Sequence, residues 1–217
     1  MNFVCLKWGT KYSAEFVNKL YGMIRRYYPA AELYCMTEDS SNINERVRII
    51  PLPDDNLEKW WWKIYLFNEE WMTLDNAIFL DLDLIIQKRF DIGFGDKPKL
   101  LYTDWIDVNQ MSKDILTDRY KYCEINSSVL AWNKYTTRHH IWEDFQKNRD
   151  KILCLFKGMD NYLNNRMKDS YEFLSPIAHS YWTTGKTWAD VPIILFDYEQ
   201  AKQDEVDEPW VHAQWKE

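Results

Sequence analysis

The sequence predicts an α/β domain with a mostly parallel central sheet flanked by helices. Short apolar runs of strand length alternate with longer segments of helical period along the 217 residues. Hydrophobic residues make up 46% of the chain and charged residues 28%, which is typical of a globular protein. The chain is also long enough to bury a full hydrophobic core. We therefore expect a single domain over residues 1–217.

The first half of the chain predicts two helices among four strands. Ser13 can cap a helix that runs through Tyr28, because Glu15 stands in its first turn and Pro29 ends it. A second, amphipathic helix is expected over 60–71. The expected strands are the apolar runs at 3–6, 32–36, 47–50 and 77–80.

The second half continues the alternation. Three further apolar runs predict strands, and two segments have helical period. The strands are expected at 100–103, 127–132 and 193–196, and the helices at 138–147 and 160–167. The segment from Gln203 to Glu208 is polar and acidic, which favours a surface loop.

Charge and glycine content exclude several classes of protein. The net charge is −7, and binding to nucleic acids or anionic membranes needs a basic surface that this sequence does not suggest. The chain has six glycines, and none of them forms the G-x-G-x-x-G fingerprint of dinucleotide binding. Aromatic residues reach 17%, and such rings both fill cores and stack on sugars and bases.

The four cysteines and the first residues of the chain indicate the cellular compartment in which we expect the protein. The cysteines form no C-x-x-C pair, so we expect free thiols in a reducing compartment rather than a zinc site. The first residues lack the basic start and long apolar stretch of a signal peptide, and no apolar run reaches the length of a membrane span. We expect a soluble, cytoplasmic protein.

The most informative stretch is 77–86, where two carboxylates interrupt an apolar run. Asp81 and Asp83 are two residues apart, so in an extended chain they project from the same face. A buried carboxylate without a partner is costly, and a divalent cation such as Mg²⁺ or Mn²⁺ would favour this placement. A D-x-D triplet alone is also compatible with an ordinary strand end, and the apolar flanks are what favour a metal site.

Several segments together resemble the nucleotide-sugar-dependent glycosyltransferases of the GT-A fold, in particular small glycogenin-like members. The resemblance covers most of the chain and depends on the order and spacing of its motifs. The similar segments are 5–12 with 16–21, 34–39, 61–67, the D-x-D at 79–83, and 125–132. It implies a nucleotide-binding part at about 1–105, and a part at about 106–217 that binds the donor sugar and the acceptor.

The resemblance implies roles in nucleotide binding for the residues after the first strand. Trp8 and Tyr12 are candidates to stack on the base, although both can instead be core aromatics, and for Trp8 the two interpretations are equally favoured. Thr10 is a candidate for a hydrogen bond to the nucleotide, or it only shapes the turn. Lys7 and Lys63 are candidates to contact phosphate or ribose, while a lysine on a helix is more often a solvated residue.

Three further residues are candidates for the sugar and the reaction. Asp160 resembles the family's carboxylate nearest the anomeric carbon, although an N-cap of the following helix is a strong alternative. Asn126 carries both donor and acceptor atoms that suit a sugar hydroxyl. Asp104 follows an expected strand and is a candidate for the donor sugar, with a loop cap slightly preferred.

The carboxyl-terminal motif departs from the family pattern. The family places a metal-binding histidine in a Phe-His-Gly stretch, and here Asp197 and Tyr198 stand in its place. Asp197 can still offer oxygen to a hard cation, which would make it a third metal ligand beside Asp81 and Asp83. The Pro-Lys-Pro that follows in the family is absent, and Lys202 is the candidate for its lysine.

The resemblance implies a metal-dependent transferase with Mn²⁺ or Mg²⁺ as cofactor. Its partners would be a nucleoside-diphosphate sugar, by resemblance a UDP sugar, and an acceptor hydroxyl, with retention of configuration. We expect Asp83→Asn to abolish metal-dependent donor binding and to leave the fold intact.

Two alternatives remain. A sugar nucleotidyltransferase would show a glycine-rich phosphate loop early in the chain, and the scattered glycines count against it. A non-catalytic member that binds a nucleotide sugar or a carbohydrate is favoured by the missing histidine and glycine near Asp197.

Overall fold

The computed structural model describes residues 1–103, 123–182, 190–197 and 201–217. Asp104 therefore lies outside the described residues. In the described part, seven strands form a central sheet whose order does not follow the chain. That order is β3 (Arg48–Pro51), β2 (Glu32–Thr37), β1 (Asn2–Lys7), β4 (Ala77–Leu80), β7 (Ile125–Trp132), β6 (Lys99–Tyr102) and β8 (Glu172–Phe173).

The sheet is mostly parallel, as the sequence predicts. Strands β3, β2, β1 and β4 are parallel to one another, and β6 is parallel to β8. Strand β7 is antiparallel to both β4 and β6. The first residues of β7 therefore lie beside the last residues of β4, at the edge where ligands bind in open sheets of this kind.

A second sheet has three strands in the order β5 (Leu84–Ile86), β10 (Ile193–Leu195) and β9 (Ala178–Ser180). Strand β5 is antiparallel to β10, and β9 is parallel to it. The sequence predicts β10 but not the other two, because three residues are too few to show a period. The D-x-D segment is thus the link between the two sheets.

Both faces of the central strands are buried, and successive side chains enter different cores. Phe3 and Cys5 belong to one core, while Val4 between them belongs to the other. The same alternation holds in β4, where Ile78 is in the first core and Phe79 in the second. A strand covered on both faces appears in sequence as a continuous apolar run.

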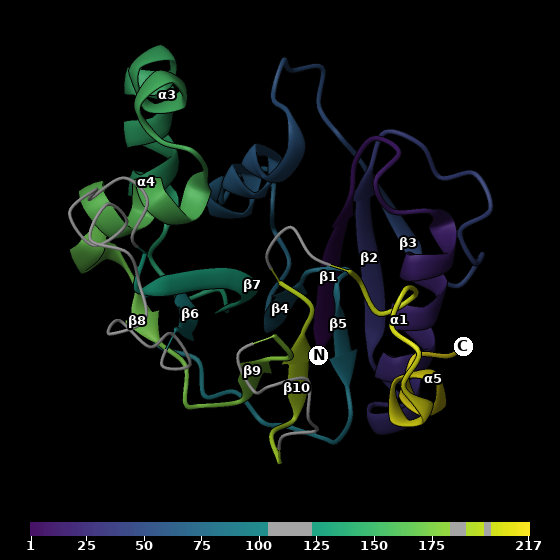
Figure 1. Ribbon diagram of the computed structural model, residues 1–217. Coiled ribbons are helices and arrows are strands. Elements are labelled where there is room, and N and C mark those ends of the chain that lie inside the picture. The colour runs from purple at the N-terminus through teal and green to yellow at the C-terminus, as the bar shows by residue number, and fades with distance from the viewer. Residues whose placement is uncertain (104–122, 183–189, 198–200) are drawn as a thin grey trace.

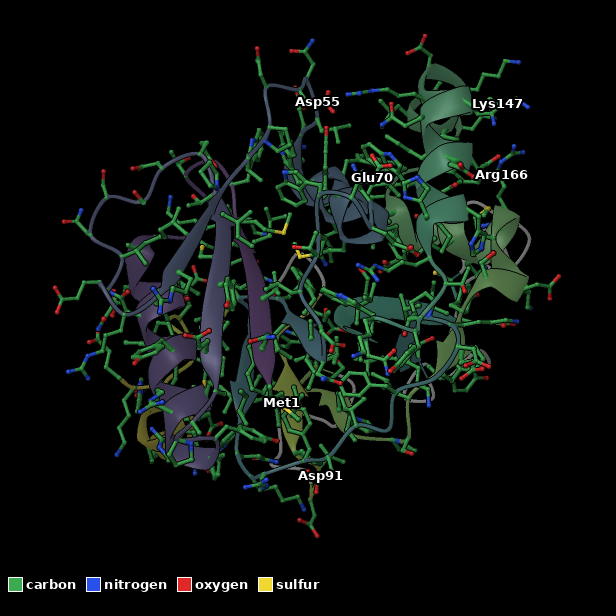
Figure 2. All side chains as sticks on the ribbon, turned by 180° about the vertical axis from the view of Figure 1, so that it is seen from behind. Met1, Asp55, Glu70, Asp91, Lys147 and Arg166 are labelled. Atoms are coloured by element: carbon green, nitrogen blue, oxygen red, sulfur yellow. The ribbon has the colours of Figure 1, made fainter. Side chains whose placement is uncertain are left out.

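Helices cover the two faces of the central sheet (Figure 1). Helix α1 (Ala14–Tyr27) and the short α5 (Pro209–Gln214) lie on the side of the first core. The 3₁₀ helix η1 (Lys59–Phe67), α3 (His139–Leu155) and α4 (Met159–Arg166) lie on the side of the second core. Figure 2, seen from behind, has Lys147 and Arg166 on these helices and Met1 and Asp91 at the far end.

Helix α1 confirms the prediction over 13–28 almost to the residue. Ser13 has the extended backbone of an N-cap, but its side chain makes no capping hydrogen bond. The helix is supported instead by an ion pair of 2.7 Å between Lys19 and Glu15 and by its buried apolar stripe. The end of the chain packs against it, because the Trp215 ring centroid lies 5.1 Å from that of Phe16.

The helix expected over 60–71 is wrong in type and in amphipathicity. The segment is a 3₁₀ helix that ends at Phe67, and every residue from Trp61 to Phe67 is buried. It is enclosed by the sheet and by α3, where the Trp61 ring stacks on Phe145 with centroids 5.8 Å apart. Lys63 therefore has no solvated face, and its ammonium group must find a partner inside the protein.

The remaining differences concern the later part of the chain. Helix α3 is kinked at Asn148, directly after the predicted end at 147, and a second helical segment continues to Leu155; the sequence did not predict this segment, β8 or α5. The segment 203–208 is a loop as predicted, but Gln203 at its start is fully buried. Cys5 and Cys35 are buried free thiols, and Cys123 and Cys154 are also unpaired. Among the described residues, no helix is long and apolar enough to cross a membrane.

Candidate functional site

The candidate site lies where β4 ends beside the start of β7. Strand β4 ends at Leu80, and the backbone N–H of Asp81 donates to the carbonyl of Ser128 at 2.9 Å. This bond continues the ladder for one residue and holds the D-x-D segment against β7. The backbone N–H of Phe196, just after β10, donates to the carbonyl of Asp83 at 2.8 Å. Both carboxylates are thus carried by a segment that is fastened at each end.

Asp81 is paired with a lysine from η1. Lys63 Nζ lies 2.7 Å from Asp81 Oδ2 and also donates to Ser127 Oγ at 3.2 Å. Burial raises the pKa of the Asp81 carboxyl, Lys63 opposes this shift, and the charge of Asp83 adds to it. The buried lysine and the buried carboxylate therefore neutralise each other.

A single oxygen of Asp83 has an ion-pair partner and a hydrogen-bond donor. Lys202 Nζ lies 3.0 Å from Asp83 Oδ2, and Tyr12 donates its hydroxyl to the same atom at 2.8 Å. Burial, followed by the nearby charge of Asp83, raises the pKa of the Tyr12 hydroxyl far above its ordinary value. Tyr12 is therefore a permanent hydrogen-bond donor here.

The segment that carries Lys202 is itself anchored to the D-x-D turn. The Lys202 ammonium donates to the carbonyl of Phe196, and its backbone N–H donates to Glu205 at 2.9 Å. The next residue, Gln203, donates its side-chain amide to the carbonyl of Leu82 at 2.7 Å. Leu82 lies between the two aspartates, so Lys202 and Gln203, which are distant in sequence, both bind the D-x-D segment.

Asp197 lies near this group and is held by a different partner. Ser180, the last residue of β9, donates its hydroxyl to Asp197 Oδ1 at 2.5 Å. Burial raises the pKa of the Asp197 carboxyl to about 6, and the negative charge of Asp83 contributes to that shift. The carboxylate is therefore a neighbour of Asp83.

Asp160 approaches the same edge from the first turn of α4. The backbone N–H of Ser127 donates to Asp160 Oδ2 at 3.3 Å, while Asp160 Oδ1 is buried and has no partner among the described residues. The Asp160 side chain makes no N-cap bond, since Gly158 takes the N-cap position. Asn126 turns its side-chain oxygen to the backbone N–H of Ser128 at 2.7 Å. The structure thus brings Asp160 and Asn126 to either side of Ser127.

The candidates nearest β1 are less closely joined to this group. Lys7 Nζ donates to the carbonyl of Asp39 at 3.2 Å, and Lys7 is buried. Trp8 packs against the second core, and Thr10 is exposed. Of the predicted nucleotide-binding residues, Tyr12 and Lys63 are therefore the two that contact the aspartates directly.

Two lysines bind the carboxylates of the predicted metal site, each through one oxygen. Mg²⁺ and Mn²⁺ need several free oxygen ligands, and here Asp81 and Asp83 each bind a lysine ammonium. In the described residues, no three Asp, Glu, His or Cys side chains lie close enough together to hold a metal ion. The predicted set of Asp81, Asp83 and Asp197 therefore does not form a metal centre in this conformation.

Sequence reasoning missed Gln203 and the partnership of Lys202 with Asp83. The only signal was a lysine near the position of the family's Pro-Lys-Pro. A separate hollow of about 450 Å³ lies between α3 and α4, lined by Asn148, Phe156 and Arg166 among others. None of the predicted site residues lines it.

The comparisons with known proteins identify the fold. No protein-family model and no curated protein matches the chain. Among solved structures, the galactosyltransferase LgtC in complex with donor and acceptor sugar analogs is similar with a TM-score of 0.65 and 14% identity, over 95% of this chain and 90% of that one. An active-site mutant of LgtC has a TM-score of 0.68 and 14% identity, over 98% of this chain and 93% of that one.

A third similar structure is the apo form of the glycosyltransferase GlyE from Streptococcus pneumoniae TIGR4. Its TM-score is 0.63 at 15% identity, and the match covers 93% of this chain and 55% of that one. At such identities the likeness concerns the backbone arrangement. The chain has the GT-A fold of these glycosyltransferases, as its sequence motifs predict.

Proposed function

We propose that the protein transfers a sugar from a nucleoside-diphosphate sugar to an acceptor hydroxyl. The observation that carries this proposal is the cluster at the β4–β7 edge, which joins Asp81, Asp83, Lys63 and Tyr12 with Asp160 nearby. The motifs that resemble those of nucleotide-sugar enzymes thus converge in space, within a GT-A fold. LgtC, which has this fold, was solved with donor and acceptor sugar analogs.

The proposed reaction breaks the bond between the anomeric carbon and the terminal phosphate oxygen. The bonding electrons leave with the diphosphate, the acceptor oxygen bonds to the anomeric carbon, and the acceptor proton passes to the departing phosphate. By resemblance the donor is a UDP sugar and configuration is retained. Positioning and charge neutralisation supply most of the acceleration in such chemistry.

Asp160 is the residue proposed to support the sugar face. In the part of the chain that the structure describes, its buried Oδ1 has no hydrogen-bond partner, and a buried polar atom without a partner is costly. A sugar hydroxyl that donates to this oxygen would satisfy it. Asn126, on the other side of Ser127, is proposed to bind a second hydroxyl through its amide.

The resemblance also implies Mn²⁺ or Mg²⁺ on Asp81, Asp83 and Asp197. Because the two lysines occupy the D-x-D carboxylates, no step of the proposed reaction is assigned to a metal ion. A protein that only binds the nucleotide sugar is the second candidate, and the replacement of the family's histidine by Asp197 favours it.

The test measures UDP release from a panel of UDP sugars, each with and without simple sugar acceptors. Asp160→Asn should lower the turnover rate about a hundredfold or more while the UDP-induced rise in melting temperature persists. Asp207→Asn serves as the control, because Asp207 is fully exposed. Binding of UDP sugars without release of UDP would favour the binding protein. Release of pyrophosphate from UTP and a sugar phosphate would favour a nucleotidyltransferase.

A further inference from the structure

Two exposed aromatic side chains lie together at the outer end of the central sheet. Tyr102 ends β6 and keeps 47% of its exposure, while Phe173 ends β8 and keeps 44%. Their ring centroids are 5.0 Å apart, and the ring planes are inclined at 66°. Burial of aromatic rings is strongly favourable, so two neighbouring rings left in water indicate a surface that binds a ligand.

The pair lies at the same edge of the sheet as the candidate site. Strands β4 and β6 are both antiparallel to β7, and β8 is parallel to β6. Tyr102 and Phe173, at the ends of β6 and β8, therefore share the edge at which β7 begins, where ligands bind in such sheets. In the register of β6 with β7, Tyr102 is opposite Ile125, and Asn126 is the next residue along β7. The proposed sugar-binding Asn126 is thus one strand away from the aromatic pair.

A third aromatic ring joins this pair to Asp160. The Tyr171 ring centroid lies 5.8 Å from that of Phe173, and Tyr171 is buried. Burial raises the pKa of the Tyr171 hydroxyl to about 12, and the nearby charge of Asp160 contributes to that shift. Within the described ranges, the Tyr171 hydroxyl and Asp160 Oδ1 are both buried without a hydrogen-bond partner. Tyr171, Phe173 and Tyr102, here called the aromatic row, thus lead from the proposed sugar-face residue to the surface.

A hollow of about 170 Å³ adjoins the exposed end of the aromatic row. Tyr102 and Phe173 form part of its wall, and Leu101 and the segment 174–178 form the rest. Most of these side chains are apolar, while Ser175 and Tyr102 add hydroxyl groups. A mostly apolar hollow with a few polar groups is typical of a site for a small ligand.

The chemistry of this wall fits the ring of a pyranoside. A pyranose has faces of C–H groups that pack on aromatic rings, and a rim of hydroxyls that hydrogen-bond to groups such as Ser175 and Tyr102. Among the described residues that line the hollow, none is charged. A phosphate or a carboxylate would therefore find no ionic partner there.

We propose that the aromatic row is the acceptor subsite, so that the acceptor is a pyranoside whose ring packs on Phe173 and Tyr102. The inference rests on the proposed function, because it names the class of substrate that supplies the attacking hydroxyl. From this position the pyranoside directs a hydroxyl toward the donor sugar at Asp160 and Asn126. The exposed rings bind and orient the acceptor and take no part in proton transfer.

The first experiment measures binding and needs no catalysis. A panel of methyl hexopyranosides, beginning with methyl β-D-glucopyranoside, is added to the wild type with bound UDP, and saturation-transfer NMR reports which sugar protons contact the protein. We expect the strongest saturation on the C–H protons of one ring face. Glycerol, which has hydroxyls but no ring, should receive none. Phe173→Ala should remove most of the saturation of the pyranoside.

The second experiment measures UDP release from a UDP sugar as the concentration of the methyl pyranoside is varied. Phe173→Ala should raise the KM for the pyranoside about tenfold and change kcat by less than about twofold, since the ring contributes to binding rather than to the chemical step. Phe173→Tyr keeps the ring and should keep the KM. Phe173→Leu keeps an apolar side chain without a flat face and should raise the KM.

Tyr135→Ala is the matched control. Tyr135 keeps 73% of its exposure and follows the last residue of β7, at the opposite edge of the sheet from the aromatic row. This variant should leave both the saturation of the pyranoside and its KM unchanged. The UDP-induced rise in melting temperature checks that each variant is folded and still binds UDP.

The outcomes separate this inference from the proposed function. If UDP sugars are cleaved but no pyranoside shows saturation or changes the rate, the inference is wrong and the proposed function stands. If the wild type is a dimer and Phe173→Ala is a monomer, the aromatic row is a subunit contact, which also overturns the inference alone. If no UDP sugar is bound or cleaved, the proposed function is overturned and the acceptor subsite with it. Saturation of one ring face, with a raised KM in Phe173→Ala and Phe173→Leu but not in Tyr135→Ala, supports both.

Discussion

The ion pair between Asp83 and Lys202 implies that Asp83→Asn lowers the stability of the fold, which the sequence alone does not predict. From sequence, Asp83→Asn is expected to leave the fold intact, because Asp83 appears as a free ligand. In the structure its carboxylate is the counter-ion of a mostly buried lysine at 3.0 Å. Replacing it by asparagine removes the carboxylate that lies 3.0 Å from the mostly buried ammonium of Lys202.

The expected loss follows from the burial of the pair. Removing one partner of a buried ion pair costs about 3 to 5 kcal/mol. The side chains of Asp83 and Lys202 keep 17% and 11% of their exposure, so the lower end of about 3 kcal/mol applies. For a chain of 217 residues this lowers the melting temperature by about 6 to 12 °C.

The double variant Asp83→Asn/Lys202→Met decides whether the loss of the ion pair is the cause. With both charges removed, we expect a loss of about 1 kcal/mol or less relative to wild type, because buried pairs exchanged for neutral groups are often nearly neutral. The assay is urea unfolding followed by tryptophan fluorescence, which the 12 tryptophans make sensitive. The double-mutant cycle should give a coupling of at least about 2 kcal/mol, because Lys202→Met alone also removes the ammonium partner of Asp83.

The control cycle uses the exposed pair of Lys88 with Asp190, for which a coupling below about 1 kcal/mol is expected. If the double variant at Asp83 and Lys202 loses as much stability as the two single variants together, the two side chains do not depend on each other. That result would refute the reasoning, since it would show that Lys202 finds its solvation elsewhere.

Two further predictions concern other polar contacts. A hydrogen bond from Arg166 lowers the pKa of the Asp144 carboxyl, so the contribution of Asp144 to stability is present above about pH 4 and is lost as the pH falls further. Asp144→Asn should lower the free energy of unfolding in urea by about 1 kcal/mol at pH 7. An equal loss at pH 2 would contradict this. Arg138 donates to the carbonyls of Leu66 and Met72 at 2.8 and 2.6 Å, and burial lowers its pKa to about 10. Arg138→Lys should lower the free energy of unfolding by about 2 kcal/mol, because a single ammonium cannot match the spacing of the guanidinium donors, and an unchanged urea midpoint would count against this role.

Much of the fold follows from local patterns in the sequence. Strand β4 is recognisable because all four residues are apolar, and the structure buries both of its faces. Helix α1 is recognisable from its stripe and its end signals, even though Ser13 makes no side-chain cap. In these segments the local preference and the tertiary packing agree, so the sequence pattern is sufficient.

The error over 60–71 has a physical origin. Three consecutive tryptophans and the apolar residues after them fit a helix of either kind. Period alone does not show that the segment will be enclosed by both the sheet and α3. Tertiary enclosure removed the solvent-facing side that an amphipathic helix requires, and it turned Lys63 from an expected surface residue into the partner of Asp81.

The sequence by itself determined the α/β architecture and the position of Asp81 and Asp83 at the end of a buried strand, because both depend on residues close together in the chain. Only the tertiary structure decided what those aspartates bind. Lys202 and Gln203 are about 120 residues away along the chain, and they return to the D-x-D turn through β10 and the loop after it. Local periodicity carries no information about such a contact, whereas burial of the four charges requires that they meet as pairs.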